Sequence, residues 1–307
     1  MLGLHHVERR GDSVYLRAWG DWYRYSVVLT ASDLPGLGHA AWRTEGEEEL
    51  ADAVARLNAN GSSGDWIESS FGHGRAYRFE GHGGQLMEIF WEVDSAIAPP
   101  GEESPYPDRP QRASNHGAAV RMLDHLTVTT PDVRGSTSWC RDELGFRVMA
   151  GVEPTPDGPW VFGVVTTNEK AHDLGFIQDF DGKRGRYHHL AFWVDTNHDL
   201  TRAAKFMIEH GCEIDLGPGQ HGIGEQEYLY VRDPAGLRWE INAGGYRNYV
   251  PDWEPTIWRP EQGSNNAYCT EIEMPPVHLV NLPPGIVGPA EPTAPVDESG
   301  HAAYARS

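Results

Sequence analysis

The sequence repeats itself over a long distance, and this repetition limits the possible fold more than any other feature. LGHAAWRTEGEEELADAVARL at 37–57 matches HHLAFWVDTNHDLTRAAKFM at 188–207, and each reads as a histidine, an apolar strand and an amphipathic helix. AYRFEGHGGQLMEIFWEVD at 76–94 matches EYLYVRDPAGLRWEINAGG at 227–245, and each reads as two strands around a glycine turn. Such self-similarity predicts duplicated supersecondary units.

The spacing of the repeat defines its units. His39 and His189 are 150 positions apart, and Glu88 and Glu240 are 152 positions apart. Each unit reads β-α-β-β-β, which predicts an α+β fold of two tandem modules, each made of paired βαβββ units. A further match, of residues 2–13 with 144–155, places the start of the chain inside the first module. We therefore expect a first module that lacks its opening strand and helix.

Composition indicates where the modules begin and end. Residues 94–120 are rich in proline, glycine, serine and charged residues, which is typical of a linker. We predict an incomplete, non-catalytic module over 1–93, a linker over 94–120, a catalytic module over 121–247 and a C-terminal extension over 248–307. The end of that extension, from about 283, is proline-rich and poor in apolar residues, so we expect it to be disordered.

Charge and cysteine content exclude several classes of protein. A formal net charge of -20 argues against nucleic acid or an anionic membrane surface as partner, because phosphate binding needs a basic face. Three scattered cysteines exclude a disulfide framework and a CxxC zinc site, and they predict a cytoplasmic protein. No apolar run approaches the length of a membrane-spanning helix, and the first residues do not read as a signal peptide.

Three residues of the second module could bind a metal ion. His125 lies in LDHLTVTT, His189 in YHHLAFWV and Glu240 in GLRWEINAGG, each in a predicted strand. Non-haem Fe(II) enzymes use two imidazoles and one carboxylate on one face of the metal. A divalent cation would also compensate the charge of a buried glutamate. Alternation along a strand allows only one of His188 and His189 to face inward. Singly, each residue would more often be structural, so the prediction depends on their combination.

The segments LDHLTVTTPDV, HHLAFWVDT, GPGQHGIGEQEYLYVRDPAGLRWEI and PDWEPTIW resemble those of type I extradiol dioxygenases, the catechol and homoprotocatechuate 2,3-dioxygenases of the vicinal oxygen chelate superfamily. The similarity covers about residues 1–260. It implies the vicinal oxygen chelate fold and the same trio of ligands for Fe(II), with Mn(II) less favoured. It also implies that O2 cleaves catechol, or an alkyl- or aryl-substituted catechol, to a 2-hydroxymuconic semialdehyde-type product. Relatives form tetramers, so we expect a homo-oligomer.

The resemblance implies three further catalytic residues. His172, in AHDLGF, matches a histidine that moves a proton between catechol and oxygen. His221, in GPGQHG, and Tyr230 match residues that hydrogen-bond the substrate or the ring-opening intermediate. Leu216 precedes the GPG turn, where relatives acting on carboxylated catechols carry an arginine. We therefore expect the substrate to carry an apolar substituent or none.

Two other functions remain open on the sequence. One is a metal-dependent, glyoxalase-like isomerase or epimerase, which would use a glutamate from each module as acid and base; Glu88 keeps this possible. The other is a non-enzymatic binding module similar to the bleomycin-resistance proteins, which lack an inward trio of two histidines and a glutamate. The first module has no partner for His125, so we expect His39 and Glu88 to have structural roles.

Overall fold

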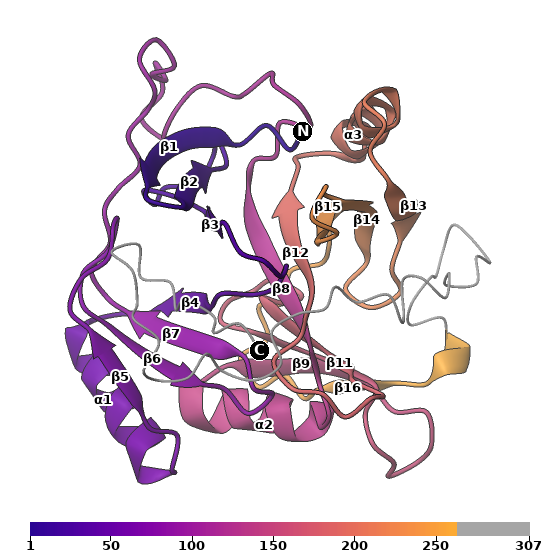
Figure 1. Ribbon diagram of the computed structural model, residues 1–307. Coiled ribbons are helices and arrows are strands. Elements are labelled where there is room, and N and C mark those ends of the chain that lie inside the picture. The colour runs from indigo at the N-terminus through magenta and orange to yellow at the C-terminus, as the bar shows by residue number, and fades with distance from the viewer. Residues whose placement is uncertain (263–307) are drawn as a thin grey trace.

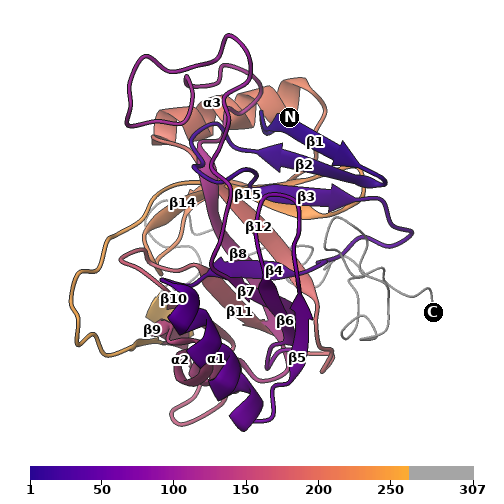
Figure 2. The ribbon, with the colours of Figure 1, turned by 90° about the vertical axis from the view of Figure 1, so that its left-hand side faces the viewer.

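The computed structural model describes residues 1–262 as two successive halves (Figures 1 and 2). The first half contains β1 (His5–Arg10), β2 (Ser13–Arg17), β3 (Val27–Thr30), β4 (Ala40–Arg43), α1 (Glu47–Ala59), β5 (Gly64–Ile67), β6 (Ala76–Glu80) and β7 (Leu86–Phe90). The second contains β8 (Met122–Thr130), α2 (Val133–Leu144), β9 (Arg147–Val152), β10 (Phe162–Thr166), β11 (Leu174–Gln178), β12 (Tyr187–Trp193), α3 (Asn197–Glu209), β13 (Ile214–Gln220), β14 (Gln226–Arg232) and β15 (Arg238–Gly244). A short strand, β16 (Thr256–Trp258), and a 3-10 turn at Pro260–Gln262 follow.

This architecture is the predicted α+β fold. No helix or strand lies between the end of β7 and the start of β8. The domain limits at residues 93, 120 and 247 stay predictions. The predicted disorder from about 283 falls outside the described residues. Among the helices of residues 1–262, none is long and apolar enough to cross a membrane.

The second half forms one continuous sheet with the order β13-β14-β15-β12-β8-β11-β10-β9-β16. Its two βαβββ units meet where β8 pairs antiparallel with β12. The helices begin at side-chain caps, because Asp132 accepts a hydrogen bond from the backbone N–H of Gly135 in α2 and Thr196 accepts one from Asp199 in α3. The pairing of β16 with β9 extends the sheet with a strand that the sequence did not indicate.

The first half repeats this pattern with its strands divided between two sheets. Their orders are β1-β2-β3 and β4-β7-β6-β5. In residues 1–93, as described, no strand takes the place that β8 holds between the two units of the second half. The repeat nevertheless extends to residue pairing, because Ala41 lies opposite Glu88 in β4 and β7 just as Ala191 lies opposite Glu240 in β12 and β15.

The two halves pack against each other through α1 and α2, which lie side by side in both views (Figures 1 and 2). Arg56 Nε of α1 donates a hydrogen bond to the backbone oxygen of Glu143 in α2, at 2.7 Å. Leu57 of α1 also belongs to the same buried apolar cluster as Val128 and Phe146 of the second half. Burial of a side chain of this kind stabilises the folded state by about 1.5–3 kcal/mol. The shared core therefore holds the first half against the sheet that carries the candidate site.

Candidate metal centre

Three neighbouring strands bring His125, His189 and Glu240 together. His125 lies on β8, His189 on β12 and Glu240 on β15, which are adjacent in the sheet. Ala191 of β12 lies opposite both His125 and Glu240. Since His189 is two residues before Ala191, all three side chains leave the same face of the sheet. One possible ligand atom from each residue lies within 4.8 Å of the other two.

The atoms that face one another are the Nε2 atoms of both histidines and Oε2 of Glu240. His125 Nε2 is 3.1 Å from this oxygen and His189 Nε2 is 3.0 Å from it, and the two nitrogens are 3.1 Å apart. All three side chains are buried. Both carboxylate oxygens of Glu240 are buried and lack a hydrogen bond of normal geometry. A buried carboxylate needs charge compensation, so these residues fit a divalent cation between them.

The opposite nitrogens of both imidazoles are held in place. His125 Nδ1 donates a hydrogen bond to Asp124 Oδ2 at 2.8 Å, and His189 Nδ1 is 2.6 Å from His188 Nδ1. Metal-binding histidines are commonly oriented by such a partner. His188 is buried as well, with its ring against that of His189, and the expectation that only one of the two faces the ligand cluster stays a prediction. A β-bulge between Tyr187 and His189 in the pairing of β12 with β8 interrupts the alternation.

The charges of the trio are balanced within the site. Although burial opposes the shift, Glu240 and Asp124 raise the pKa of His125 to about 9. Burial lowers the pKa of His189 to about 3. Burial likewise opposes ionisation of Glu240, yet His125 holds the pKa of that carboxyl well below its ordinary value. Both shifts favour a proton on His125 beside an ionised Glu240, and a metal ion bound between these residues would displace such a proton.

The three further predicted site residues lie around this cluster. His172 is buried two residues before the start of β11, with its ring centroid 4.1 Å from that of His125. Burial and the charge of His125 lower the pKa of His172 well below its ordinary value, so this imidazole is neutral. The Tyr230 ring lies 5.1 Å from the His189 ring, and His221 Nε2 is 2.9 Å from the Tyr230 hydroxyl oxygen. The structure thus brings all six predicted site residues together.

An apolar wall lies beside Tyr230. Leu216 of β13 is opposite Tyr230 of β14, and both are buried in one cluster with Tyr228. The His221 ring stacks on the Tyr228 ring, with centroids 4.1 Å apart. This side of the site is therefore lined by aromatic and aliphatic groups. Recognition of a substrate carboxylate would need a positively charged residue there.

The matching positions of the first module are arranged differently. Glu88 is completely buried and lies opposite Arg78, as Glu240 lies opposite Tyr230. Arg78 Nε and Nη2 donate hydrogen bonds to Glu88 Oε2 at 2.9 and 2.7 Å. His39 Nε2 is 3.9 Å from Glu88 Oε1. Arginine thus supplies the charge that a metal would otherwise provide.

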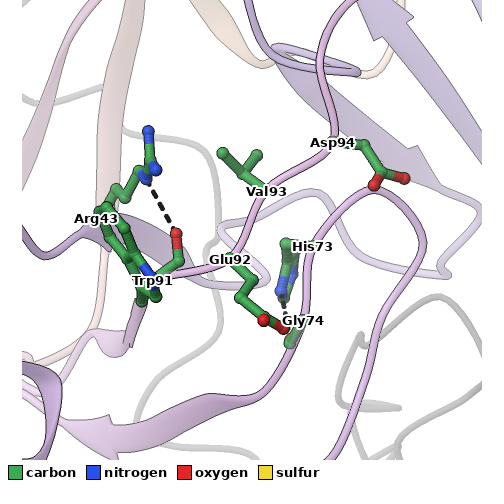
Figure 3. A pocket seen from close by; sticks show the side chains of 7 residues that line it. All are labelled: Arg43, His73, Gly74, Trp91, Glu92, Val93 and Asp94. Atoms are coloured by element: carbon green, nitrogen blue, oxygen red, sulfur yellow. Dashed lines mark hydrogen bonds between the residues drawn. The ribbon is translucent and has the colours of Figure 1, made fainter. Parts of the chain in front are cut away.

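An open pocket adjoins this arrangement (Figure 3). It is lined by Arg43, His73, Gly74, Trp91, Glu92, Val93 and Asp94. His73 connects it to the interior, because His73 Nδ1 is 3.0 Å from the backbone oxygen of Gly74 and Nε2 is 3.4 Å from Glu88 Oε1. Within residues 1–262, the group of His125, His189 and Glu240 is the only one with three potential ligand atoms at metal-binding distances.

Comparisons with known proteins identify the family. The family model described as "Glyoxalase/Bleomycin resistance protein/Dioxygenase superfamily" matches residues 122–241. A manganese-dependent 2,3-dihydroxybiphenyl 1,2-dioxygenase of Geobacillus genomosp. 3 is 35% identical over 280 residues, covering 90% of this chain and 88% of the relative. A metapyrocatechase of Geobacillus stearothermophilus is 33% identical over 269 residues, covering 87% and 81%.

Solved structures show the same fold. The 2,3-dioxygenase LapB from Pseudomonas sp. KL28 superposes with a TM-score of 0.76 at 26% identity, covering 85% of this chain and 90% of that one. Homoprotocatechuate 2,3-dioxygenase from Arthrobacter globiformis gives a TM-score of 0.80 at 25% identity, covering 93% and 85%. An extradiol ring-cleaving dioxygenase from B. fuscum also matches, at 25% identity with a TM-score of 0.79. By sequence and fold, this chain belongs to the extradiol dioxygenases of the glyoxalase/bleomycin resistance protein/dioxygenase superfamily.

Proposed function

We propose that this chain cleaves catechol, or a catechol with an alkyl or aryl substituent, beside its two hydroxyl groups. Both atoms of O2 enter the 2-hydroxymuconic semialdehyde-type product. The buried trio of His125, His189 and Glu240 carries this proposal, because two imidazoles and one carboxylate are the ligand set of non-haem iron oxygenases. The similarity to ring-cleaving dioxygenases over most of the chain favours this function over an isomerase or a binding module.

In this proposal the trio holds Fe(II), with Mn(II) as the alternative because one relative is named manganese-dependent. A bound metal would supply a template that orients the two catechol oxygens and O2 beside each other. In the proposal His172 accepts a proton from a catechol hydroxyl and returns it, because its imidazole is buried directly beside His125.

Tyr230 and His221 would orient the substrate. Burial and the neighbouring Glu240 raise the pKa of Tyr230 well above its ordinary value, so its hydroxyl stays protonated and can donate a hydrogen bond to a catechol oxygen. The contact between His221 Nε2 and the Tyr230 hydroxyl fixes the direction of that group. We also propose a homo-oligomer in the cytoplasm, and gel filtration of the purified chain would test the assembly.

Metal loading provides the test of the proposed function. Metal-free protein, prepared without oxygen, would be loaded with Fe(II), Mn(II) or Zn(II) and then given catechol and air. We expect O2 uptake and a yellow ring-fission product with Fe(II) or Mn(II), and neither with Zn(II), which has no redox chemistry. Folded protein that consumes no O2 with any of these metals would overturn the proposal.

Substrate preference follows from the apolar wall at Leu216. We expect 3-methylcatechol and 2,3-dihydroxybiphenyl to have a higher kcat/KM than homoprotocatechuate, by roughly tenfold or more. A carboxylate placed against buried Leu216 and Tyr228 would lose hydration without gaining a partner, and about 1.4 kcal/mol corresponds to tenfold in rate. Steady-state O2 uptake with the three substrates, with catechol as reference, measures this preference. A higher kcat/KM for homoprotocatechuate would contradict it.

A further inference from the structure

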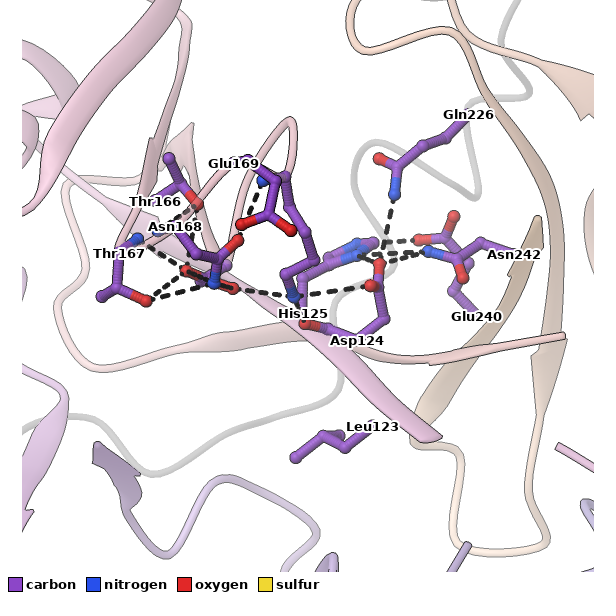
Figure 4. A network of polar contacts seen from close by, with 12 residues as sticks. Leu123, Asp124, His125, Thr166, Thr167, Asn168, Glu169, Gln226, Glu240 and Asn242 are labelled. Carbon is purple, nitrogen blue, oxygen red and sulfur yellow. Dashed lines mark hydrogen bonds and ion pairs between the residues drawn. The ribbon is translucent and has the colours of Figure 1, made fainter. Parts of the chain in front are cut away.

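Asp124 is the centre of a polar network behind His125 (Figure 4). Its side chain is only 6% exposed, and its Oδ2 accepts hydrogen bonds from His125 Nδ1 at 2.8 Å, Asn242 Nδ2 at 2.6 Å and Gln226 Nε2 at 3.1 Å. Lys170 approaches from the other side, with Nζ 2.5 Å from the backbone oxygen of Asp124 and 3.4 Å from Oδ1. Four groups from separate segments thus fix this carboxylate.

Lys170 also belongs to the loop that carries His172. This loop connects β10 to β11, and Lys170 precedes His172 by two residues. Its ammonium forms a second ion pair with Asp173 Oδ1, at 2.7 Å, on the other side of His172 in the sequence. The Lys170 ammonium therefore links the residues on either side of His172 to Asp124. Asp124 in turn accepts the hydrogen bond from His125.

We propose that Asp124 and Lys170 form a clamp that positions His172 relative to His125. The clamp rests on the proposed function, because its task is to place an acid–base imidazole beside a metal ligand. A displacement of a catalytic group by about 1 Å can cost about 100-fold in rate. Ion pairs that are mostly buried and hydrogen-bonded, as these are, hold their geometry more rigidly than exposed pairs.

The clamp acts on one of the two histidines. Behind His125 stands the carboxylate of Asp124, whereas behind His189 stands the imidazole of His188. Carboxylate partners make a ligating histidine more basic. Loss of Asp124 should therefore weaken metal binding as well as release the His172 loop, whereas loss of Lys170 should chiefly affect the loop.

Four variants and two controls test the clamp. The variants are D124N, K170Q, the double variant and K170R; the controls are D142N and K205Q, which alter exposed ion pairs. Metal affinity is measured by titrating metal-free protein with Mn(II) alone, followed by electron paramagnetic resonance. Turnover of catechol is measured at saturating Fe(II), and melting temperatures are recorded for every protein.

We expect D124N to weaken Mn(II) binding by about 10–100-fold, the usual effect of losing the partner of a ligand. K170Q should lower kcat by about 10–100-fold with a smaller change in KM, because the proton-transfer group is misplaced. K170R, which keeps the cation, should recover most of kcat. The double variant should be no worse than the poorer single variant, since residues acting as one unit are not additive.

The outcomes separate the clamp from the proposed function. Wild-type protein that binds no Mn(II) and turns over no catechol with Fe(II) overturns both. Functional wild-type protein whose variants match the controls in affinity and kcat overturns the clamp alone, even if their melting temperatures fall. Effects that add in the double variant, or a K170R protein no better than K170Q, also overturn it.

Discussion

Replacing Glu240 by alanine is expected to abolish stable metal binding and to lower ring cleavage by more than about 100-fold. This bound follows because losing a residue that merely supports a ligand already costs about 10–100-fold. Glu240 is the only carboxylate of the trio, so the variant would offer a divalent cation two imidazoles and no negative charge. Metal content after anaerobic dialysis and O2 uptake with catechol measure the two effects.

The matched control is Glu209→Ala, which removes an exposed carboxylate from the end of α3. It should keep wild-type metal content and turnover. Glu240→Gln serves as a second variant of nearly unchanged volume, and it should fail as the alanine variant does because an amide carries no charge. A Glu240 variant that retains its metal and full turnover would show that the ligands lie elsewhere.

Replacing Arg78 by methionine is expected to lower the free energy of unfolding by roughly 3–5 kcal/mol, the usual effect of breaking a buried ion pair by removing one partner. Glu88 is completely buried, and both of its short hydrogen bonds come from Arg78. Without the guanidinium, its charge would remain buried with only His73 and His39 nearby. Urea unfolding of the metal-free protein measures the loss.

Two companion variants make this prediction specific. Arg184→Met breaks an exposed pair with Glu80 and should cost no more than about 1 kcal/mol. The double variant R78M/E88L removes both buried charges and should regain most of the lost stability, because replacing a whole buried pair by apolar groups is often nearly neutral. Equal stabilities for R78M and R184M would refute the role given to Arg78.

Periodic features made much of this fold predictable. The repeat and the strand and helix patterns indicate two α+β modules, since hydrophobic alternation is a local property of the chain. The same alternation selects His125, His189 and Glu240 as inward residues of three strands. Their common face follows from adjacent strands pairing at Ala191, and the structure does bring them together. Whether they bind a metal is the prediction that the Glu240 variants test.

Tertiary structure alone decided the groups that support this site. Lys170 reaches Asp124 across 46 positions of the sequence, and a β-bulge brings His188 against His189. The register of β6 and β7 places Arg78 opposite Glu88. At the matching place in the second module, the register of β14 and β15 places Tyr230 opposite Glu240. The sequence determined the modules and the inward trio, because these depend on local periodicity. Bulges, register and contacts between distant loops depend on how the whole chain packs, so only the folded protein specifies them.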